Sequence, residues 1–347
     1  MRFLILPIAL FAVGALYWWL PIAPFTVAAD GTNTAAAAAA AGREPDFWGH
    51  WGDGKSEISS YALEYPRYGS PREGVAVTIF VNEQLSEKAR VKHEDPSRGE
   101  EDILPVMKLN WIQDFPTGIY DYSLMTTVFA LLEERGGIPA GALKKVSFSA
   151  QEWCGHIYSQ LLFSPGRTEL SSHSYFDGEG DVEASLDLPA GGLSEDALLL
   201  WARGFAGARP APGASIEVPL LRSLEKSRLL HVDLGWQTAT ATREEQPREV
   251  RVPAGSFVVD RYTLSVPAAR VERSWPVGAP TMELPASIWT VDVEGRFPHR
   301  IVQWSRDDGL RARLLGSDRI PYWERKGPAG ISELGKIGLR PRPPRTP

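Results

Sequence analysis

Residues 145–175 read KVSFSAQEWCGHIYSQLLFSPGRTELSSHSY, and this stretch decides the fold. Apolar and polar side chains alternate in it with a period of two, which places one face of a β-strand in a core and the other in water. The alternating runs are 145–153, 156–163 and 169–175, and turn-forming residues separate them. The stretch therefore predicts three successive β-strands with short connections.

Runs of the same kind recur along most of the chain, between Gly, Pro, Asn and Asp residues. So many strands with so few helical segments argue against a parallel α/β sheet. We expect a mainly β protein, a long antiparallel meander curled into a half-barrel or a sandwich. The other expected strands are 57–65, 75–81, 106–111, 118–129, 182–188, 215–221, 228–240, 248–252, 257–266, 288–294, 300–304 and 311–315.

A single segment near residues 194–204 has the pattern of a helix. Ser194 can cap its first turn, and the acidic pair Glu195 and Asp196 suits the positive end of a helix dipole. Good helix formers follow, and Gly204 closes the segment. We expect one packed helix here.

The N-terminus has the features of an export signal. Residues 3–29 carry no charge, follow Arg2 and end in the small-residue sequence VAA. This pattern predicts a signal peptide over residues 1–29, or a membrane anchor if the segment is not cleaved. In both cases we expect the body of the protein in the periplasm or secreted. Membrane contact is expected only through an uncleaved segment.

The rest of the chain divides by composition. Residues 30–43 contain no apolar residue larger than alanine, which predicts a linker. Two β regions follow, 44–176 and 177–327, which we expect to pack together as one unit. Residues 328–347 end in a run rich in proline and arginine. Because proline cannot donate to a sheet, this run predicts a polyproline-like tail.

Composition excludes some classes of function. The 347-residue chain has a formal net charge of -6 and a pI near 5.7, so it offers no basic field to nucleic acid. Its only cysteine, Cys154, leaves no intramolecular disulfide. The sequence contains no G-x-S-x-G, P-loop, H-E-x-x-H or G-x-G-x-x-G motif, and nothing in it predicts a cofactor.

Three motifs of the second half carry a resemblance. Residues 252–257 (VPAGSF), 288–293 (IWTVDV) and 297–302 (FPHRIV) resemble a family of exported Gram-negative proteins, a domain of unknown function. That family looks like the periplasmic lipoprotein carriers, in which a long antiparallel sheet curls into a half-barrel around a helix. The resemblance implies a concave sheet that can shelter an apolar ligand. The residues themselves predict a hairpin turn after Val252.

The first half is similar to uncharacterised secreted bacterial proteins, and neither resemblance brings functional residues. The motifs that carry it are 50–55 (HWGDGK), 58–61 (ISSY), 66–69 (PRYG), 117–123 (TGIYDYS) and 149–155 (SAQEWCG). Beside the first of them, an aromatic plug that closes the sheet is predicted from Phe47, Trp48 and Trp51.

The most suggestive catalytic candidates are Glu152, Cys154 and His156. If this segment continues one strand, alternation puts all three on one face, where they could act as nucleophile, base and orienting group. Neighbours two apart on a strand lie roughly 7 Å from each other, so the thiol would need a bulge to reach the imidazole. Gly155 could supply that bulge. In the alternative interpretation it is a bend, with Cys154 buried in the core.

The acidic residues Asp177, Glu179 and Asp181 are spaced as oxygen ligands of a calcium loop. The pattern departs from an EF-hand at Val182, where glycine is expected, and at Leu188, where the bidentate acid should be. The alternative interpretation is a solvated acidic hairpin turn, because Asp-Gly and Glu-Gly steps form turns by themselves.

Three functions are open. The leading hypothesis is a non-catalytic envelope protein that binds an apolar or amphipathic molecule, such as a lipid, in the hollow of its sheet. The second is a structural or assembly protein whose sheet edge or proline-rich tail meets another envelope protein. The third is a hydrolase or transferase that uses Glu152, Cys154 and His156.

Overall fold

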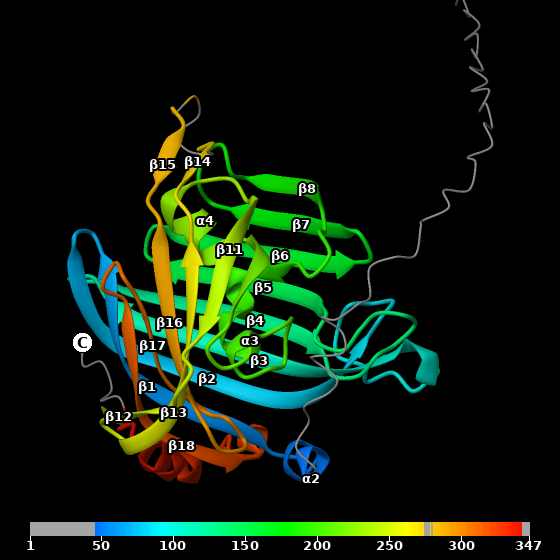
Figure 1. The fold of residues 1–347 in the computed structure, drawn as a ribbon, viewed down its shortest axis with the longest axis vertical. Helices are drawn as coiled ribbons and strands as arrows, with labels where there is room; N and C mark the ends of the chain where they lie inside the picture. Colours follow the sequence, from blue (N-terminus) through cyan, green and yellow to red (C-terminus); the bar gives the residue numbers. More distant parts are fainter. Residues whose placement is uncertain (1–45, 274–277, 279, 342–347) are drawn as a thin grey trace, which may run out of the picture. The chain divides into compact units, whose positions relative to one another are not determined.

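The computed structural model describes residues 46–341 except 274–277 and 279, and these belong to one compact unit (Figure 1). The expected signal peptide or anchor over 1–29 and the linker over 30–43 lie outside the described residues. In the described part the chain is mainly β, as the alternation predicts, with one large sheet and few helices. None of the described helices has the length and hydropathy that a bilayer crossing requires.

The first half of the chain forms an antiparallel meander in which each strand pairs with the next in sequence. In β5 the side chains of Val146, Phe148 and Ala150 are buried, while the residues between them face the other side. One face of the meander therefore belongs to the core. The strands are β1 (Ser56–Arg67), β2 (Ser70–Ser86), β3 (Ile103–Pro116), β4 (Asp121–Leu131), β5 (Leu143–Glu152), β6 (Gly155–Ser164), β7 (Arg167–Ser174) and β8 (Asp181–Asp187).

The second half extends the same sheet from the other side of β1. Its last strand, β18, pairs antiparallel with β1, with Ser56 opposite Ile320. The order continues through β17, β16, β13, β11, β10 and β9, and the β9–β10 pair is parallel. The strands of the large sheet here are β9 (Leu193–Ser194), β10 (Ser215–Leu221), β11 (Trp236–Arg243), β12 (Arg248–Val252), β13 (Gly255–Val266), β16 (Ser287–Glu294), β17 (Ile301–Arg306) and β18 (Arg311–Ile320). β14 (Ala269–Val271) and β15 (Met282–Leu284) pair with each other in a separate two-stranded sheet.

The two halves of the sheet face each other across a shared core. Figure 1 shows β11, β13 and β16 crossing in front of the first-half strands. The ring centroid of Trp111 in β3 lies 6.5 Å from that of Trp289 in β16 and 5.5 Å from that of Trp304 in β17. The sheet is not closed into a barrel, because β8 and β9 form its two ends without pairing to each other.

The helix expected near residues 194–204 is confirmed. The Ser194 hydroxyl accepts a hydrogen bond from the Asp196 amide, and a 3₁₀ turn, η2 (Glu195–Ala197), leads into α3 (Leu198–Ala202). All residues of α3 are fully buried. The helix itself therefore fills the hollow of the sheet at this position.

A further helix, α4 (Leu224–Leu230), lies where the sequence predicts the beginning of a strand over 228–240. Ser223 caps α4, and the strand, β11, starts only at Trp236. The prediction of a single helix is thus wrong for this segment. The apolar residues of so short a run fit a helix as well as a strand. The contacts that favour the helix come from other parts of the chain.

Two predicted local features are found near the ends of strands. Phe47 and Trp51 of α2 (Phe47–Trp51) are buried, and their rings lie 6.2 and 5.6 Å from that of Phe205. They form the expected aromatic plug, whereas Trp48 is exposed. The predicted hairpin turn is also confirmed, since Val252 of β12 pairs with Gly255 of β13.

Part of the expected C-terminal tail belongs to the folded body. Residues 328–337 form a 3₁₀ helix, η4 (Pro328–Ile337), and the Ser60 hydroxyl of β1 donates to the Ile337 carbonyl oxygen. Residues 342–347 lie outside the described residues. The remaining short 3₁₀ helices are η1 (Glu100–Asp102) and η3 (Tyr322–Glu324).

The two edge strands of the sheet, β8 and β9, are poor templates for pairing with further strands. The β8 strand exposes Asp181, Glu183 and Asp187 along its length, and β9 has only two residues. Charge and shortness are both devices that prevent edge-to-edge pairing.

Replacing Trp201 of α3 tests how far the core depends on this helix. Trp201 is fully buried and its indole nitrogen donates to the Ala208 carbonyl oxygen at 2.7 Å. We expect Trp201→Ala to lower the free energy of unfolding by about 3–5 kcal/mol in urea denaturation. The matched control, Trp153→Ala, removes a side chain that is 65% exposed and should change stability by less than about 1 kcal/mol. Equal effects would contradict this account.

A second prediction concerns Asp196, which lies in η2 just before α3 and whose carboxyl group contacts the first residue of α4. The amide of Leu224 donates to Asp196 at 3.0 Å, and burial raises the pKa of Asp196 to about 7. The unfolded chain releases this proton near pH 4, so its ionisation costs the native state stability as the pH rises from about 4 to 7. Asp196→Asn should therefore gain stability relative to wild type over that interval in urea titrations. A pH-independent difference would contradict the assignment.

Candidate functional site

The structure separates the residues of the expected catalytic set. β5 ends at Glu152 and β6 begins at Gly155, which pair with each other, so Trp153 and Cys154 form a tight hairpin turn. Glu152 is buried on the core face, whereas His156 is exposed on the outer face. The side chains do not share one face, because the chain reverses between them.

Cys154 at this turn is exposed, so the interpretation of a buried core thiol does not hold either. Its amide donates to Glu152 Oε2 at 2.9 Å, and a side-chain hydrogen bond with the same carboxylate raises the pKa of the thiol. Glu152 also lies 3.6 Å from Arg228 of α4. A thiol that a neighbouring carboxylate keeps protonated is a poor nucleophile.

The carboxylates of the acidic segment between β7 and β8 have different partners and do not converge on one point. Glu179 Oε1 lies 2.7 Å from His231 Nδ1. Asp181 Oδ1 lies 2.7 Å from His173 Nδ1, and Asp177 is exposed to solvent. Within the described ranges, no group of three or more His, Cys, Asp and Glu side chains is placed to hold a metal ion.

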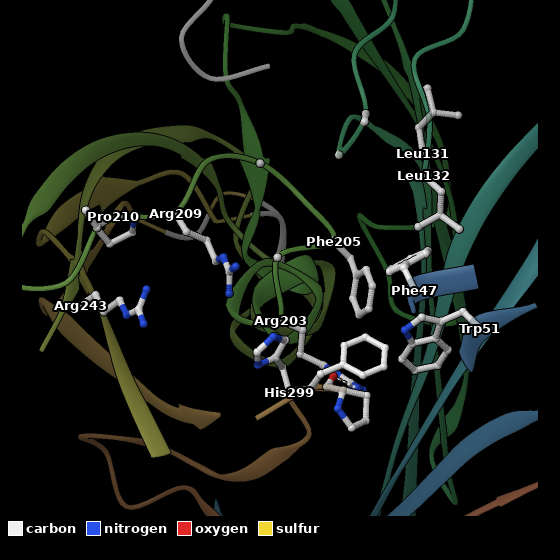
Figure 2. Close-up of a pocket in the computed structure, with 17 residues that line it drawn as sticks. Phe47, Trp51, Leu131, Leu132, Arg203, Phe205, Arg209, Pro210, Arg243 and His299 are labelled. Atoms are coloured by element: carbon white, nitrogen blue, oxygen red, sulfur yellow. Dashed lines mark hydrogen bonds between the residues drawn. The ribbon is translucent and has the colours of Figure 1, made fainter. Parts of the chain in front are cut away.

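A pocket of about 290 Å³ opens at the end of α3, between the two halves of the sheet (Figure 2). Its walls come from α2, from the connection between β4 and β5, from the loop that follows α3, and from the turn that precedes β17. Segments far apart in the sequence thus meet here, which is why the alternation of single strands gives no sign of it.

One side of the pocket is apolar and the other is cationic. Figure 2 shows Phe47, Trp51 and Leu132 on one side, with Arg209 and Arg243 on the other. The aromatic rings belong to the plug formed by α2, and they pack edge-on against neighbouring rings. A molecule in the pocket would therefore meet hydrocarbon at one end and guanidinium groups at the other.

Two of the arginines in the pocket are already paired. Arg203 is buried and donates to both carboxylate oxygens of Glu57, at 2.6 and 3.1 Å. Arg243 lies 2.9 Å from the Asp260 carboxylate. Because each has a partner of opposite charge, neither leaves a net charge in the pocket.

The third arginine, Arg209, takes part in none of the ion pairs between described residues. Its Nη1 donates to the Ala202 carbonyl oxygen at 3.0 Å and to the Tyr262 hydroxyl at 3.2 Å. Both acceptors are neutral, so one positive charge in the pocket has no counter-charge from the described chain.

A glycine determines where Arg209 lies. Gly204, which ends the helical segment, has a φ of +83°, and a Cβ added to it would come within 2.7 Å of the Arg209 Nη2. The guanidinium can therefore lie against the end of α3, where cations are favoured by the helix carbonyls. The sequence identifies Gly204 as the helix end. A cation shortly after such a glycine is the signal that would have pointed to Arg209.

A larger cavity of about 450 Å³ lies beside α4. Two of its cations are paired, Lys226 at 3.6 Å from Glu195 and Arg306 at 2.6 Å from Asp308. Its third cation, Arg67, donates to the hydroxyls of Tyr68 and Tyr122 and has no carboxylate partner among the described residues. The cavity is also lined by acidic residues, Glu225, Asp307 and Asp308, which would repel an anion, whereas the described lining of the pocket at the end of α3 contains none. The pocket at the end of α3 is therefore the better candidate for an anionic ligand.

Comparisons with protein-family models, curated proteins and solved structures found no match to this chain. The resemblances drawn from sequence motifs therefore stay predictions. The proposal of a function therefore depends on the geometry of the pocket at the end of α3.

The raised pKa of the Cys154 thiol gives a test at the hairpin turn. At neutral pH we expect iodoacetamide to modify native Cys154 more slowly than the same cysteine in urea, although the residue is exposed. Glu152→Gln removes the charge that keeps the thiol protonated and should speed the reaction several-fold, as followed by mass spectrometry. Native Cys154 reacting faster than the unfolded chain would instead indicate an activated thiol.

Proposed function

We propose that this protein binds a small amphipathic anion in the pocket at the end of α3. The observation that carries the proposal is the guanidinium of Arg209, which has neutral partners and faces a pocket with an apolar opposite side. A ligand with a negative head and an apolar body is complementary to both sides. This narrows the lipid-like ligand expected from the sequence to one with an anionic head.

The hydrogen bonds of Arg209 within the protein leave donors for the anionic head of a ligand. Its bonds to Ala202 and Tyr262 both use Nη1. Nε and Nη2 form the planar pair of donors that matches the two oxygens of a carboxylate, sulfonate or phosphate. A half-buried cation without a counter-charge has lost part of its hydration, so an anion that replaces the missing partner gains affinity there.

The size of the site limits the body of the ligand. Small-molecule pockets usually have volumes of about 300–1,000 Å³, and this pocket of about 290 Å³ lies at the lower limit. The buried residues of α3 occupy the neighbouring hollow. The pocket therefore suits a single short hydrocarbon chain or a small ring system rather than a lipid with two chains.

The lining of the pocket offers little for catalysis by a nucleophile. The described residues that form it include no Ser, Thr, Cys, Lys, Asp or Glu side chain, and their one histidine, His299, has its Nδ1 3.1 Å from the Glu294 carbonyl oxygen. With the export signal expected over residues 1–29, we place this binding function outside the cytoplasm. The edge strand β8 is charged and the edge strand β9 is short, so neither supports assembly through β-strand addition.

The test is the affinity for decanoate, measured by isothermal titration calorimetry. Arg209→Gln should weaken binding by about 10-fold or more, because a charge-assisted hydrogen bond contributes about 1.5–3 kcal/mol. Arg209→Lys keeps the charge but loses the planar pair of donors, so it should give an intermediate affinity.

Decanol, which has the same chain without the charge, is the ligand control and should bind much more weakly than decanoate. The protein control is Arg248→Gln, which removes an arginine on β12 that is ion-paired with Glu244 and lies outside the pocket. Decanoate affinity that is unchanged in Arg209→Gln, or equal affinity for decanol, would refute the proposal.

A further inference from the structure

Four turns of the first half lie in a row along the side of the sheet where the strands end. Because β1 to β8 form a meander, the turns β1–β2, β3–β4, β5–β6 and β7–β8 all fall at the same end of the strands (Figure 1). Neighbouring turns are two strand spacings apart, about 9.6 Å. The two-residue turn of Cys154 is one of them.

Each of these turns exposes a large side chain. In order along the edge, the exposed fractions are 57% for Tyr68, 86% for Ile119, 65% for Trp153 and 71% for Tyr175. Together with Tyr120, these residues form a surface that we call the aromatic edge. Scattered apolar side chains on a surface need no explanation, but a regular row of them indicates an interaction site.

Ring contacts link the first three turns of the aromatic edge, in part through the buried ring of Tyr122. The ring centroids of Tyr120 and Trp153 are 6.1 Å apart, and those of Tyr120 and Tyr122 are 5.9 Å apart. Tyr68 and Tyr122 are separated by 6.4 Å. The three turns from β1–β2 to β5–β6 are thus joined by ring contacts, and Tyr175 extends the row at the next turn.

Polar groups run beside the rings. The hydroxyls of Tyr68 and Tyr122 are 2.7 Å apart, and the Tyr120 hydroxyl donates to that of Tyr68 at 3.4 Å. Arg67 donates to the Tyr122 hydroxyl at 3.2 Å. Phenol and guanidinium groups therefore lie beside the rings at the β1–β2 and β3–β4 turns.

We propose that the aromatic edge binds a polysaccharide chain. A sugar ring has an apolar C–H face, which packs on a tyrosine or tryptophan ring, and hydroxyls at its rim, which meet phenol and guanidinium groups. Turns repeated about every 9.6 Å along the edge can contact successive units of one extended chain. The exposed side chains lie on successive turns at the ends of the strands, so they offer a row of contacts that suits a polymer.

The charges on the turns argue against a lipid bilayer as the occupant. Asp177 is exposed on the same turn as Tyr175, and Arg67 lies next to Tyr68. Insertion of these tips into hydrocarbon would remove charged groups from water at a large cost in free energy. A hydrated polysaccharide leaves them in solvent.

The test is electrophoresis of the purified protein in native gels that contain dextran, hydroxyethyl cellulose, xylan or polygalacturonate. We expect at least one polysaccharide to retard the protein. In that gel, Trp153→Ala and Tyr68→Ala should each weaken the affinity at least about fivefold, through loss of a ring contact. The matched control is Trp323→Ala, which removes a 39% exposed tryptophan from η3 and should leave retardation unchanged.

Circular dichroism of each variant establishes that it is folded before its retardation is compared. Absence of retardation in all four gels, or equal retardation of Trp153→Ala and Trp323→Ala, overturns the proposal. Sedimentation with vesicles of phosphatidylethanolamine and phosphatidylglycerol is run in parallel. Vesicle binding that Trp153→Ala abolishes would replace the polysaccharide with a lipid surface.

Discussion

An antiparallel sheet with one apolar face cannot leave that face in water, and this chain covers it with the other half of the same sheet. The pairing that makes this possible joins β1 to β18, so that Ser56 lies opposite Ile320. Every second-half strand of the large sheet is positioned from this pair outward, and the core forms where the halves face each other. Such a long-range contact gains its free energy only after most of the chain has been ordered.

Buried polar pairs determine how the helices sit within that core. Arg203, next to α3, is held by Glu57 of β1. Glu225 of α4 accepts hydrogen bonds from Tyr65 of β1 and Gln113 of β3, both at 2.7 Å, and burial raises its pKa. Apolar packing alone would tolerate sliding of the helices over the strands. A buried charge that loses its partner is costly, so these pairs favour one arrangement.

The sequence predicts the parts of this fold that depend on neighbours along the chain. Alternation over 145–163 predicts both β5 and β6, and Ser194 and Gly204 delimit the helical segment of η2 and α3 correctly. It does not predict α4, because the amides of that helix are held by acids about thirty residues earlier, with Ser223 donating to Glu195.

The same reasoning explains the outcome for the site residues. The one-strand interpretation of Glu152, Cys154 and His156 failed because two residues are enough for a hairpin turn. Across this turn the buried positions change from even numbers (146, 148 and 150) to odd numbers (157, 159 and 161), so residues on its two sides that are two or four apart do not share a face. The sequence marks Arg209 only as a cation shortly after the helix-ending Gly204, which does not make it a site residue. Its significance comes from the fold, which brings it neutral partners and no carboxylate from among the described residues.

The lengths of the elements explain why the pocket lies at one end of the hollow. β4 has 11 residues and spans about 35 Å, whereas α3 and α4 with 5 and 7 residues would cover only about 18 Å end to end. α4 lies toward the turns of the aromatic edge, since Arg228 contacts Glu152 at the end of β5. At the opposite end of the strands, α2 closes the hollow with Phe47 and Trp51. The pocket remains between that plug and the end of α3, where neither helix fills the space.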